Sequence, residues 1–351
     1  MENSTVIYVN ARFLTQPLTG VQRYAFECCM QMKREYPALI FLSPPNIIHE
    51  QWAKELHVTE IGSHRGHMWE QWDLYRYLCK KEQYILFNPC NTAPLGLRNN
   101  VITIHDLAFV FCKENFSWWF TGWYNFLIPR IAANALHLFA VSETMKQQLY
   151  ETYSLPTEKI TVTYNGIASN FLEALEDKRP FKKEKIIMTV GSLSKRKNID
   201  VLMKAFIQSS LRDEYILIIV GAKHAVFEEI ELPENKRAIL LHDLSDKQLM
   251  QYYRRAEIFV SLSSYEGFGI PVLEALAFGC KVLCSDIETY HELFEDYVYF
   301  CDHADSDQII KALKEIATHT APPSTESILK KYSFISNAAI ILQILLKSKN
   351  Q

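Results

Sequence analysis

The chain has 351 residues, of which 48% are apolar and 22% are charged, a composition typical of a soluble globular protein. At roughly 100–200 residues per domain, this length predicts two domains. The formal net charge is −3 and no basic stripe dominates, which argues against a nucleic-acid partner.

The N-terminal stretch enters a strand-like run directly, without the charged and then apolar pattern of a signal peptide. We find no stretch of about 18 apolar residues and therefore expect no membrane-spanning helix. The eight cysteines form no Cys-x-x-Cys pair, and we interpret them as reduced, mostly buried thiols of a cytoplasmic protein.

Short apolar or β-branched runs alternate with helix-like segments along the whole chain. In the first half, the expected strands cover residues 5–9, 38–42, 85–87, 101–104, 136–141 and 160–163. In the second half, they cover residues 186–190, 215–220, 238–241, 258–262 and 281–284. Such runs are typical of strands buried on both faces of a parallel sheet, and their alternation with helices predicts an α/β fold.

Three local signals place the ends of helices. Ser142 precedes a helical run, as an N-cap residue does. Ser245 followed by Gln248 predicts a capping box at the start of a helix. Gly279 stands where a helix that begins near Phe268 should end.

The alternation of strands and helices is interrupted by a charged stretch that contains Pro180. We therefore predict an N-terminal domain over residues 1–170, a linker over 171–184 and a second domain over 185–332. Residues 333–351 are expected to form a helix that packs back toward the N-terminal domain. Two such lobes would form a cleft between the carboxyl ends of their sheets, where open α/β sheets bind ligands.

The segment SSYEGFGIPVLEALAFGCKV follows an expected strand and opens a helix. Gly267 and Gly269 allow the backbone to approach a ligand closely, and the N–H groups at the helix start offer an anion or hydroxyl site. Glu266 precedes the turn, and Glu274 lies eight residues later, where its carboxylate could accept hydrogen bonds from a ribose diol. A buried structural turn is the alternative interpretation.

The segment MTVGSLSKRKNIDVLMKAF contains a second strand end, at Gly191, and a loop that leads into a helix at Asn198. Lys195, Arg196 and Lys197 lie in this loop. Cations beside a helix N-terminus suit a diphosphate, because Arg binds phosphate in a bidentate way and Lys acts as a point charge. A solvated basic loop is the alternative.

These two segments together resemble the retaining glycosyltransferases of family 4, which have the GT-B fold. The resemblance implies two Rossmann-like β/α/β domains whose parallel sheets face a central cleft, the N-terminal domain binding the acceptor and the second domain the donor. It extends to the first half of the chain through PLTGVQRYAFE, HDLAFVF, VSETMKQQL and YNGI. In all it covers most of residues 5–345, and mannosyltransferase-like members are the most similar in overall pattern.

The resemblance also implies roles for the residues of the turn. Glu274 would bind the donor ribose, and Glu266 would contact the transferred sugar or stabilise charge. The backbone of four successive residues would meet the sugar and the phosphates: Gly267, Phe268, Gly269 and Ile270.

Further donor-site roles follow for the basic loop. Lys197 and Arg196 would hold the diphosphate, beside Gly191 and Ser192. Ser192 stands where many members carry Arg, so Arg196 is the expected source of the guanidinium group.

Two residues of the first half complete the implied site. Gly20 would lie close to the phosphates across the cleft. His105 would face the reacting sugar, with a hydrogen-bonded structural histidine as the alternative.

The expected function is transfer of a hexose from a nucleotide sugar to a glycan or lipid-linked acceptor, with retention of configuration. GDP-mannose is the preferred donor by similarity, and UDP- and dTDP-sugars stay open. No Asp-x-Asp motif follows a strand convincingly, so we expect no metal and no other cofactor. The resemblance further implies a bacterial surface polysaccharide, such as O-antigen or capsule, made in the cytoplasm.

An aromatic segment, FSWWFTGWYNF at residues 116–126, admits two interpretations. One is a helix that packs its apolar face within the N-terminal domain. The other is a surface that meets the inner face of a membrane or a lipid-linked acceptor, which is a peripheral contact.

Other functions remain as alternatives. A sugar phosphorylase or a nucleotide-sugar epimerase would use the same fold, and a non-catalytic protein would only bind the nucleotide sugar. A dehydrogenase is not expected, because no G-x-G-x-x-G follows the first strand.

Overall fold

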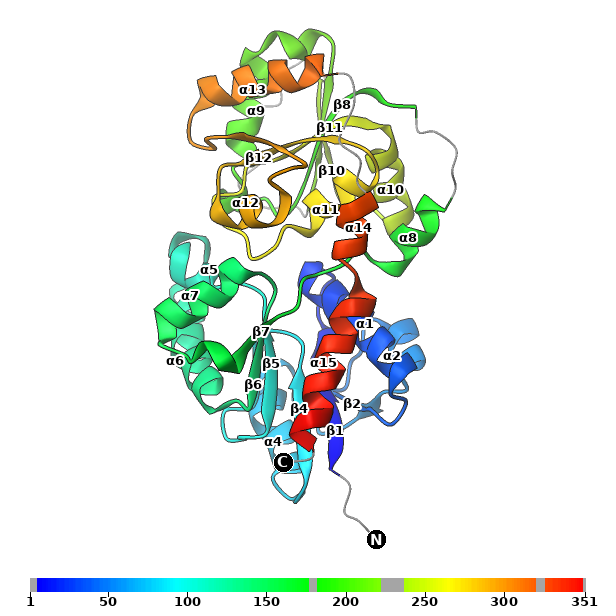
Figure 1. The fold of residues 1–351 in the computed structure, drawn as a ribbon, viewed down its shortest axis with the longest axis vertical. Helices are drawn as coiled ribbons and strands as arrows, with labels where there is room; N and C mark the ends of the chain where they lie inside the picture. The colour runs from blue at the N-terminus through cyan, green and yellow to red at the C-terminus, as the bar shows by residue number, and fades with distance from the viewer. Residues whose placement is uncertain (1–4, 177–181, 222–236, 320–325, 350–351) are drawn as a thin grey trace. The chain divides into compact units, whose positions relative to one another are not determined.

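The computed structural model describes residues 5–176, 182–221, 237–319 and 326–349. The chain forms two compact units, which we call the first unit (residues 1–168 and 332–351) and the second unit (residues 169–331). Each unit contains its own parallel β-sheet with helices, so the α/β prediction is confirmed (Figure 1).

The first unit is built on a seven-stranded sheet with the order β3-β2-β1-β4-β5-β6-β7. Its strands are β1 (Val6–Asn10), β2 (Ile40–Ser43), β3 (Thr59–Glu60), β4 (Tyr84–Asn88), β5 (Asn100–Ile104), β6 (His137–Ala140) and β7 (Ile160–Val162). All neighbouring strands pair in parallel. The chain runs from β1 outward to β3 and then returns to β4 on the other side of β1, so the strand order reverses between β1 and β4.

Helices connect these strands. They are α1 (Gly20–Glu35), α2 (Glu50–Leu56), α3 (Gly66–Met68), α4 (Tyr75–Leu78), α5 (Ala108–Phe111), α6 (Trp118–Asn134), α7 (Glu143–Tyr153) and α15 (Phe334–Lys349). A π-helical turn, Trp69–Leu74, joins α3 to α4. Short 3-10 turns lie at Arg12–Thr15, Lys113–Asn115 and Thr157–Lys159.

Helix α15 completes the core of the first unit although it follows the whole second unit in sequence. Its buried residues include Phe334, Ile341 and Leu345, which belong to the same apolar cluster as Cys28 and Cys29 of α1. Within the segment expected to form the closing helix, residues Phe334–Lys349 are helical, and this helix packs on α1.

The C-terminal helical stretch also carries a membrane-like signal that the sequence analysis did not expect. Of the residues described, one stretch, Glu326–Ser348, is long and apolar enough to cross a membrane, and 44% of its apolar window is buried. Since the inner face of α15 lies in the core described above, this stretch has the contacts of a core helix.

The second unit contains a six-stranded sheet with the order β10-β9-β8-β11-β12-β13. Its strands are β8 (Glu184–Val190), β9 (Ile216–Val220), β10 (Ala238–Leu241), β11 (Ala256–Ser261), β12 (Lys281–Ser285) and β13 (Tyr299–Cys301). All pair in parallel, and the order reverses between β8 and β11.

The helices of the second unit cover this sheet (Figure 1). They are α8 (Ser169–Leu175), α9 (Ile199–Gln208), α10 (Asp246–Arg255), α11 (Ile270–Ala277), α12 (Glu288–Phe294), α13 (Ser306–Thr318) and α14 (Glu326–Lys331). Two 3-10 turns lie at Lys195–Lys197 and Ser210–Asp213.

The predicted helix signals agree with the structure. The hydroxyl of Ser142 accepts from the backbone of α7, and Ser245 with Gln248 forms a capping box on α10. Gly279 follows α11 in a left-handed conformation (φ 71°), which a glycine adopts without strain.

Three features differ from the sequence-based expectation. Strands β3 and β13 were missed: β3 has only two residues, both polar and exposed, and β13 has three. The predicted linker over 171–184 is partly wrong, because α8 lies within it and belongs to the second unit. Residues 177–181 of that linker lie outside the described residues.

The cysteines are all free thiols. Six of them are buried, Cys90 is partly buried and Cys79 is exposed. The prediction of reduced, mostly buried cysteines therefore agrees with their burial.

Candidate donor site and the polar residues of the first sheet

The candidate donor site lies at the carboxyl end of the second unit's sheet. Strands β8 and β11 are neighbours, and the strand order reverses between them. The loops that follow these two strands contain the basic turn at residues 195–197 and the turn that begins at Glu266. Open α/β sheets bind ligands at this kind of position, so the two predicted segments meet where a ligand site is expected.

Backbone hydrogen bonds join these two loops. The amide of Ser264 donates to the carbonyl of Arg196 (2.9 Å), and the Asn198 side chain donates to the carbonyl of Leu262 (2.8 Å). Asn198 adopts a left-handed conformation (φ 49°), which Asn tolerates better than most residues and which ends the basic turn. The basic turn is thereby held against the end of β11.

The absence of a side chain at Gly191 makes room for Lys197. A Cβ atom at Gly191 would lie 3.2 Å from Cε of Lys197, closer than ordinary van der Waals contact. Ser192 follows on the exposed side, and its hydroxyl lies 3.2 Å from that of Ser194. Gly191 thus lies beside Lys197, and the hydroxyl of Ser192 bonds to that of Ser194. Their donor-binding roles stay predictions.

The side chains of Lys197, Arg196 and Glu266 form one compact ion cluster. Lys197 Nζ donates to Oε1 of Glu266, and Arg196 Nη1 lies 3.1 Å from its Oε2. The three side chains are only 12–16% exposed. Arg196 also donates to the carbonyl of Tyr265.

The electrostatics of this cluster leave it positive. Burial opposes ionisation of Glu266, but the charges of Arg196 and Lys197 outweigh it and lower the pKa of the carboxyl group to about 2. Two cations therefore face one carboxylate, which leaves one net positive charge at the carboxyl end of the sheet. An anionic group such as a diphosphate would be attracted there.

The turn before α11 depends on Gly269. This residue has a φ of 103°, and a Cβ atom there would lie 2.7 Å from the ring of Tyr290. Any other residue would be strained and would clash. Pro271 follows in the first turn of α11, where its missing N–H costs nothing.

The other residues of this turn divide between core and backbone roles. The Phe268 side chain is buried and packs edge-on against Phe294, at 6.1 Å between ring centroids. Only its backbone is therefore suited to meet a ligand, together with those of Gly267 and Ile270 at the start of the helix. Thr289 donates to the carbonyl of Glu266 (2.9 Å) and fixes the turn from the side of α12.

Glu274 lies on α11 and is only 4% exposed. Its Oε2 accepts a hydrogen bond from the hydroxyl of Tyr253 (3.0 Å), a fully buried residue of α10. Tyr253 orients the carboxylate, and the sequence analysis missed it because it lies 21 positions away. The ribose-binding role of Glu274 stays a prediction.

His105 follows β5 in the first unit and is 6% exposed. Its Nε2 donates to the carbonyl of Pro89 (2.7 Å), and its ring packs edge-on against Tyr24 at 4.5 Å. Burial lowers the pKa of His105, so the ring is neutral near pH 7. These contacts fit the structural alternative, and a role at the reacting sugar stays a prediction.

Gly20 is the first residue of α1 and is exposed. Thr19 and Gln22 form a capping box around it, and Gln22 also donates to the side chain of Gln16 (3.1 Å). The N-terminus of α1 is thus a rigid, capped helix start. Its role near the donor phosphates stays a prediction.

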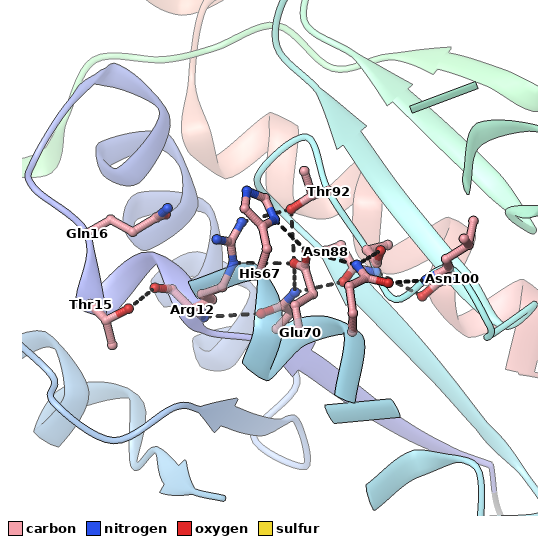
Figure 2. A network of polar contacts seen from close by, with 12 residues as sticks. Arg12, Thr15, Gln16, His67, Glu70, Asn88, Thr92 and Asn100 are labelled. Atoms are coloured by element: carbon pink, nitrogen blue, oxygen red, sulfur yellow. Dashed lines mark hydrogen bonds and ion pairs between the residues drawn. The ribbon is translucent and has the colours of Figure 1, made fainter. Parts of the chain in front are cut away.

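A buried polar network in the first unit was not predicted from the sequence (Figure 2). It connects Asn10, Arg12, Glu70, Asn88 and Thr92, which come from both sides of the point where the strand order reverses. The side chains of Asn10 and Arg12 bond to partners 60 to 80 positions away in the sequence, so no local motif could have shown the network.

Among the residues that the structure describes, no three His, Cys, Asp or Glu side chains are grouped so that they could hold a metal ion. The expectation of metal-independent activity stays a prediction.

The fold and the positions of these sites define a class of protein with two Rossmann-like units, the GT-B class. The solved structure of sucrose-phosphate synthase from Thermosynechococcus elongatus is similar over 98% of both chains, with a TM-score of 0.74 at 15% identity. Residues 18–171 match the family model of glycosyltransferase family 4, and residues 171–333 match that of the group 1 glycosyl transferases. The chain therefore belongs to the group 1 glycosyltransferases, with a family 4 domain as its N-terminal half.

Two curated relatives are more similar in sequence. The O-antigen chain mannosyltransferase RfbU of Salmonella typhimurium is 31% identical over 232 residues, which is 64% of this chain and 63% of that protein. The O-antigen chain mannosyltransferase B of Escherichia coli is 25% identical over 325 residues, 84% of this chain and 85% of that protein. The first match thus spans somewhat less than two thirds of its relative.

Proposed function

We propose that this protein transfers a hexosyl residue from a nucleotide sugar to a glycan or lipid-linked acceptor. The ion cluster of Arg196, Lys197 and Glu266 carries the proposal, because it supplies net positive charge at the carboxyl end of the second unit's sheet, where open α/β sheets bind ligands. The start of α11 adds its positive end to the same turn. Membership of a glycosyltransferase family supports this assignment.

The proposed reaction proceeds with retention of configuration. The bond between the anomeric carbon and the diphosphate oxygen breaks, and its electron pair stays on the phosphate. The acceptor hydroxyl oxygen bonds the anomeric carbon from the same face, and the leaving phosphate takes its proton. Lys197 and Arg196 would stabilise the charge that develops on the diphosphate, which is the usual source of the largest catalytic effect.

Glu266 would have two tasks in this scheme. Before the donor binds, it holds both cations at one place, so that little reorganisation is needed when the diphosphate arrives. Once the diphosphate binds the two cations, the carboxylate of Glu266 would contact the transferred sugar. No metal is required in this scheme, because the cations and the helix start supply the positive charge.

GDP-mannose is our preferred donor, and bacterial surface polysaccharide is the preferred product. Both named relatives are O-antigen chain mannosyltransferases, which supports this choice. The test is a thermal-shift panel of GDP-, UDP- and dTDP-sugars at one concentration, since a ligand that binds the folded protein more tightly raises the unfolding temperature further. GDP-mannose should give the largest shift; a panel without any shift would refute the proposed function.

Glu274→Gln should raise the Kd for GDP about 10- to 100-fold, because one or two charge-assisted hydrogen bonds to the ribose are weakened. Isothermal titration calorimetry measures this. Tyr253→Phe is the matched control, because it removes the hydroxyl bound to Glu274 and leaves the carboxylate in place. If both variants lower the unfolding temperature and neither changes the Kd, Glu274 has only a structural role.

The aromatic segment of α6 is divided between a buried half and an exposed half. Its second half packs inward through Leu127, Ile128 and Ile131. Its first half exposes a group of large aromatic side chains, which we call the aromatic surface: Trp118, Trp119, Phe120, Trp123 and Phe126. Trp118 and Trp119 are about 70% exposed. Exposed apolar groups of this size mark interaction surfaces, and we propose peripheral contact with the inner face of a membrane.

Trp118→Ser with Trp119→Ser should abolish most binding to liposomes of phosphatidylethanolamine and phosphatidylglycerol in a flotation assay. The reason is the loss of two indole rings that would otherwise insert at the lipid–water interface. Trp72→Ser is a control, because Trp72 is also exposed, at 53%, but lies outside α6. Flotation of the double variant at the wild-type level would contradict the membrane contact.

A further inference from the structure

The polar network of the first unit lies where its strand order reverses. Asn10 ends β1 and Asn88 ends β4, and the Asn10 side chain donates to that of Asn88 (3.0 Å). Ligands of open α/β sheets bind outside the carboxyl ends of the strands at such a point. The proposed donor site uses none of these residues, so the position calls for a ligand of its own.

Glu70 is the centre of the network, and its side chain is 1% exposed. Its Oε1 accepts from Asn10 (2.9 Å) and from Thr92 (3.0 Å), and Arg12 Nε lies 3.4 Å away. Figure 2 shows Arg12, Thr92 and His67 around this carboxylate, each from a separate segment or turn. Burial opposes its ionisation, but Arg12, His67 and Asn10 together lower the pKa of Glu70 to about 2.

The second oxygen of Glu70 faces a histidine at the surface. His67 Nδ1 lies 3.5 Å from Oε2 as an ion-pair contact, and this nitrogen is shielded from solvent without a hydrogen bond of its own. A carboxylate beside Nδ1 favours the tautomer with the proton there, which makes Nε2 an acceptor. The His67 side chain is 33% exposed, so a buried charge orients an accessible imidazole.

The backbone around His67 is unusual. Trp69–Leu74 form a π-helical turn, and π-helical turns recur at functional sites. Trp69 is fully buried, and its Nε1 donates to the carbonyl of Ile61 (2.7 Å), which anchors the turn. The turn directs Glu70 inward while His67, just before it, stays accessible.

The neighbours of His67 suit a sugar. The Tyr124 hydroxyl lies 3.5 Å from Nε2 of His67, and the Trp123 ring lies 6.3 Å from the imidazole with 37% of its surface exposed. Aromatic rings cover the apolar face of a pyranose, while imidazole and phenol groups bind its hydroxyls. Burial raises the pKa of Tyr124 to about 12, so its hydroxyl keeps its proton.

We propose that His67 binds a hydroxyl group of the acceptor saccharide, with Trp123 against the sugar ring and with Glu70 and Arg12 as positioning residues. The proposal rests on the proposed function, because it assigns the acceptor of that reaction. A free glycan and a lipid-linked saccharide share this chemistry. Because Trp123 belongs to the aromatic surface, an acceptor with a lipid chain would have apolar contacts beside its sugar.

The test measures release of GDP from GDP-mannose with increasing methyl α-mannopyranoside or octyl α-mannopyranoside. His67→Ala should raise the KM for either acceptor about 10- to 100-fold, because one hydrogen bond between the imidazole and a sugar hydroxyl is lost. The GDP release that occurs without acceptor should stay unchanged. His67→Gln, whose amide can reach the position of Nε2, should recover part of the loss. A lower KM for the octyl compound in the wild type would point to the lipid-linked source.

His64→Ala is the matched control. His64 is 36% exposed and pairs with a carboxylate too, Asp73 at 3.0 Å, but it has no contact with the network. Equal KM values for the His64 and His67 variants would overturn the proposal, as would a wild type whose GDP release neither acceptor accelerates. Failure of GDP-mannose to bind at all would instead refute the proposed function, since donor binding depends on the second unit.

Discussion

Lys197→Ala should lower kcat for sugar transfer by about 30- to 900-fold, which corresponds to about 2–4 kcal/mol of transition-state stabilisation. Lys197 is only 14% exposed and contacts Glu266 in the candidate donor site. In that low-dielectric position its charge would act on the leaving diphosphate more strongly than a solvated lysine would. Initial rates at saturating donor and acceptor measure the effect.

Lys195→Ala is the matched control for this experiment. Lys195 lies in the same 3-10 turn and carries the same charge, but it is exposed. It should change kcat less than about twofold, because a solvated charge is strongly screened. Equal rates for the two variants would remove Lys197 from the reaction and leave the ion cluster as a structural feature.

Arg12→Met should lower the free energy of unfolding of the first unit by about 3–5 kcal/mol, because it leaves the buried charge of Glu70 without its cation. Both side chains are nearly inaccessible, at 6% and 1% exposure. Combining Arg12→Met with Glu70→Gln should recover much of the loss, since no charge is then buried. A single variant as stable as the wild type would contradict this account of the network.

All six tryptophans lie in the first unit, so their fluorescence in urea follows the unfolding of this unit alone.

The same fluorescence signal tests how the stability of the first unit depends on pH. The pKa of Glu70 falls from 4.5 to about 2 on folding, so its ionisation stabilises the fold fully above pH 4.5. That contribution, about 3 kcal/mol, is lost as the pH falls through 4.5 toward 2. In the Glu70→Gln variant, the free energy of unfolding should fall less steeply with decreasing pH than in the wild type. Parallel curves of the two proteins would contradict this prediction.

Much of the fold could be predicted from the sequence, because its signals are local. Each expected strand is a continuous apolar run, and the caps at Ser142 and Ser245 need only three neighbouring positions. The α/β class and the parallel sheets followed from these patterns. Strand β3 escaped because its two residues, Thr59 and Glu60, are polar and exposed.

The candidate site was predictable only in part. Gly269 and Lys197 stand in contiguous motifs, and the structure brings Lys197 to Glu266. Tyr253 bonds to Glu274, 21 positions away, and Glu70 accepts from Asn10, 60 positions away, so these contacts exist only in the folded unit. His105 shows the opposite case: it stands in a motif, yet its burial and its bond to Pro89 describe a packing role just as well.

The first unit consists of two segments that are far apart in the sequence, and this affects how it folds during synthesis on the ribosome. Helix α15, which supplies Ile341 and Leu345 to its core, is translated after the entire second unit. Part of the apolar core of residues 1–168 therefore stays exposed until α15 has been synthesised. The second unit is contiguous, so all its strands are synthesised before α15. The apolar core of the first unit can be completed only after the second unit has been synthesised, and the exposed apolar surface of the nascent first unit favours aggregation until then.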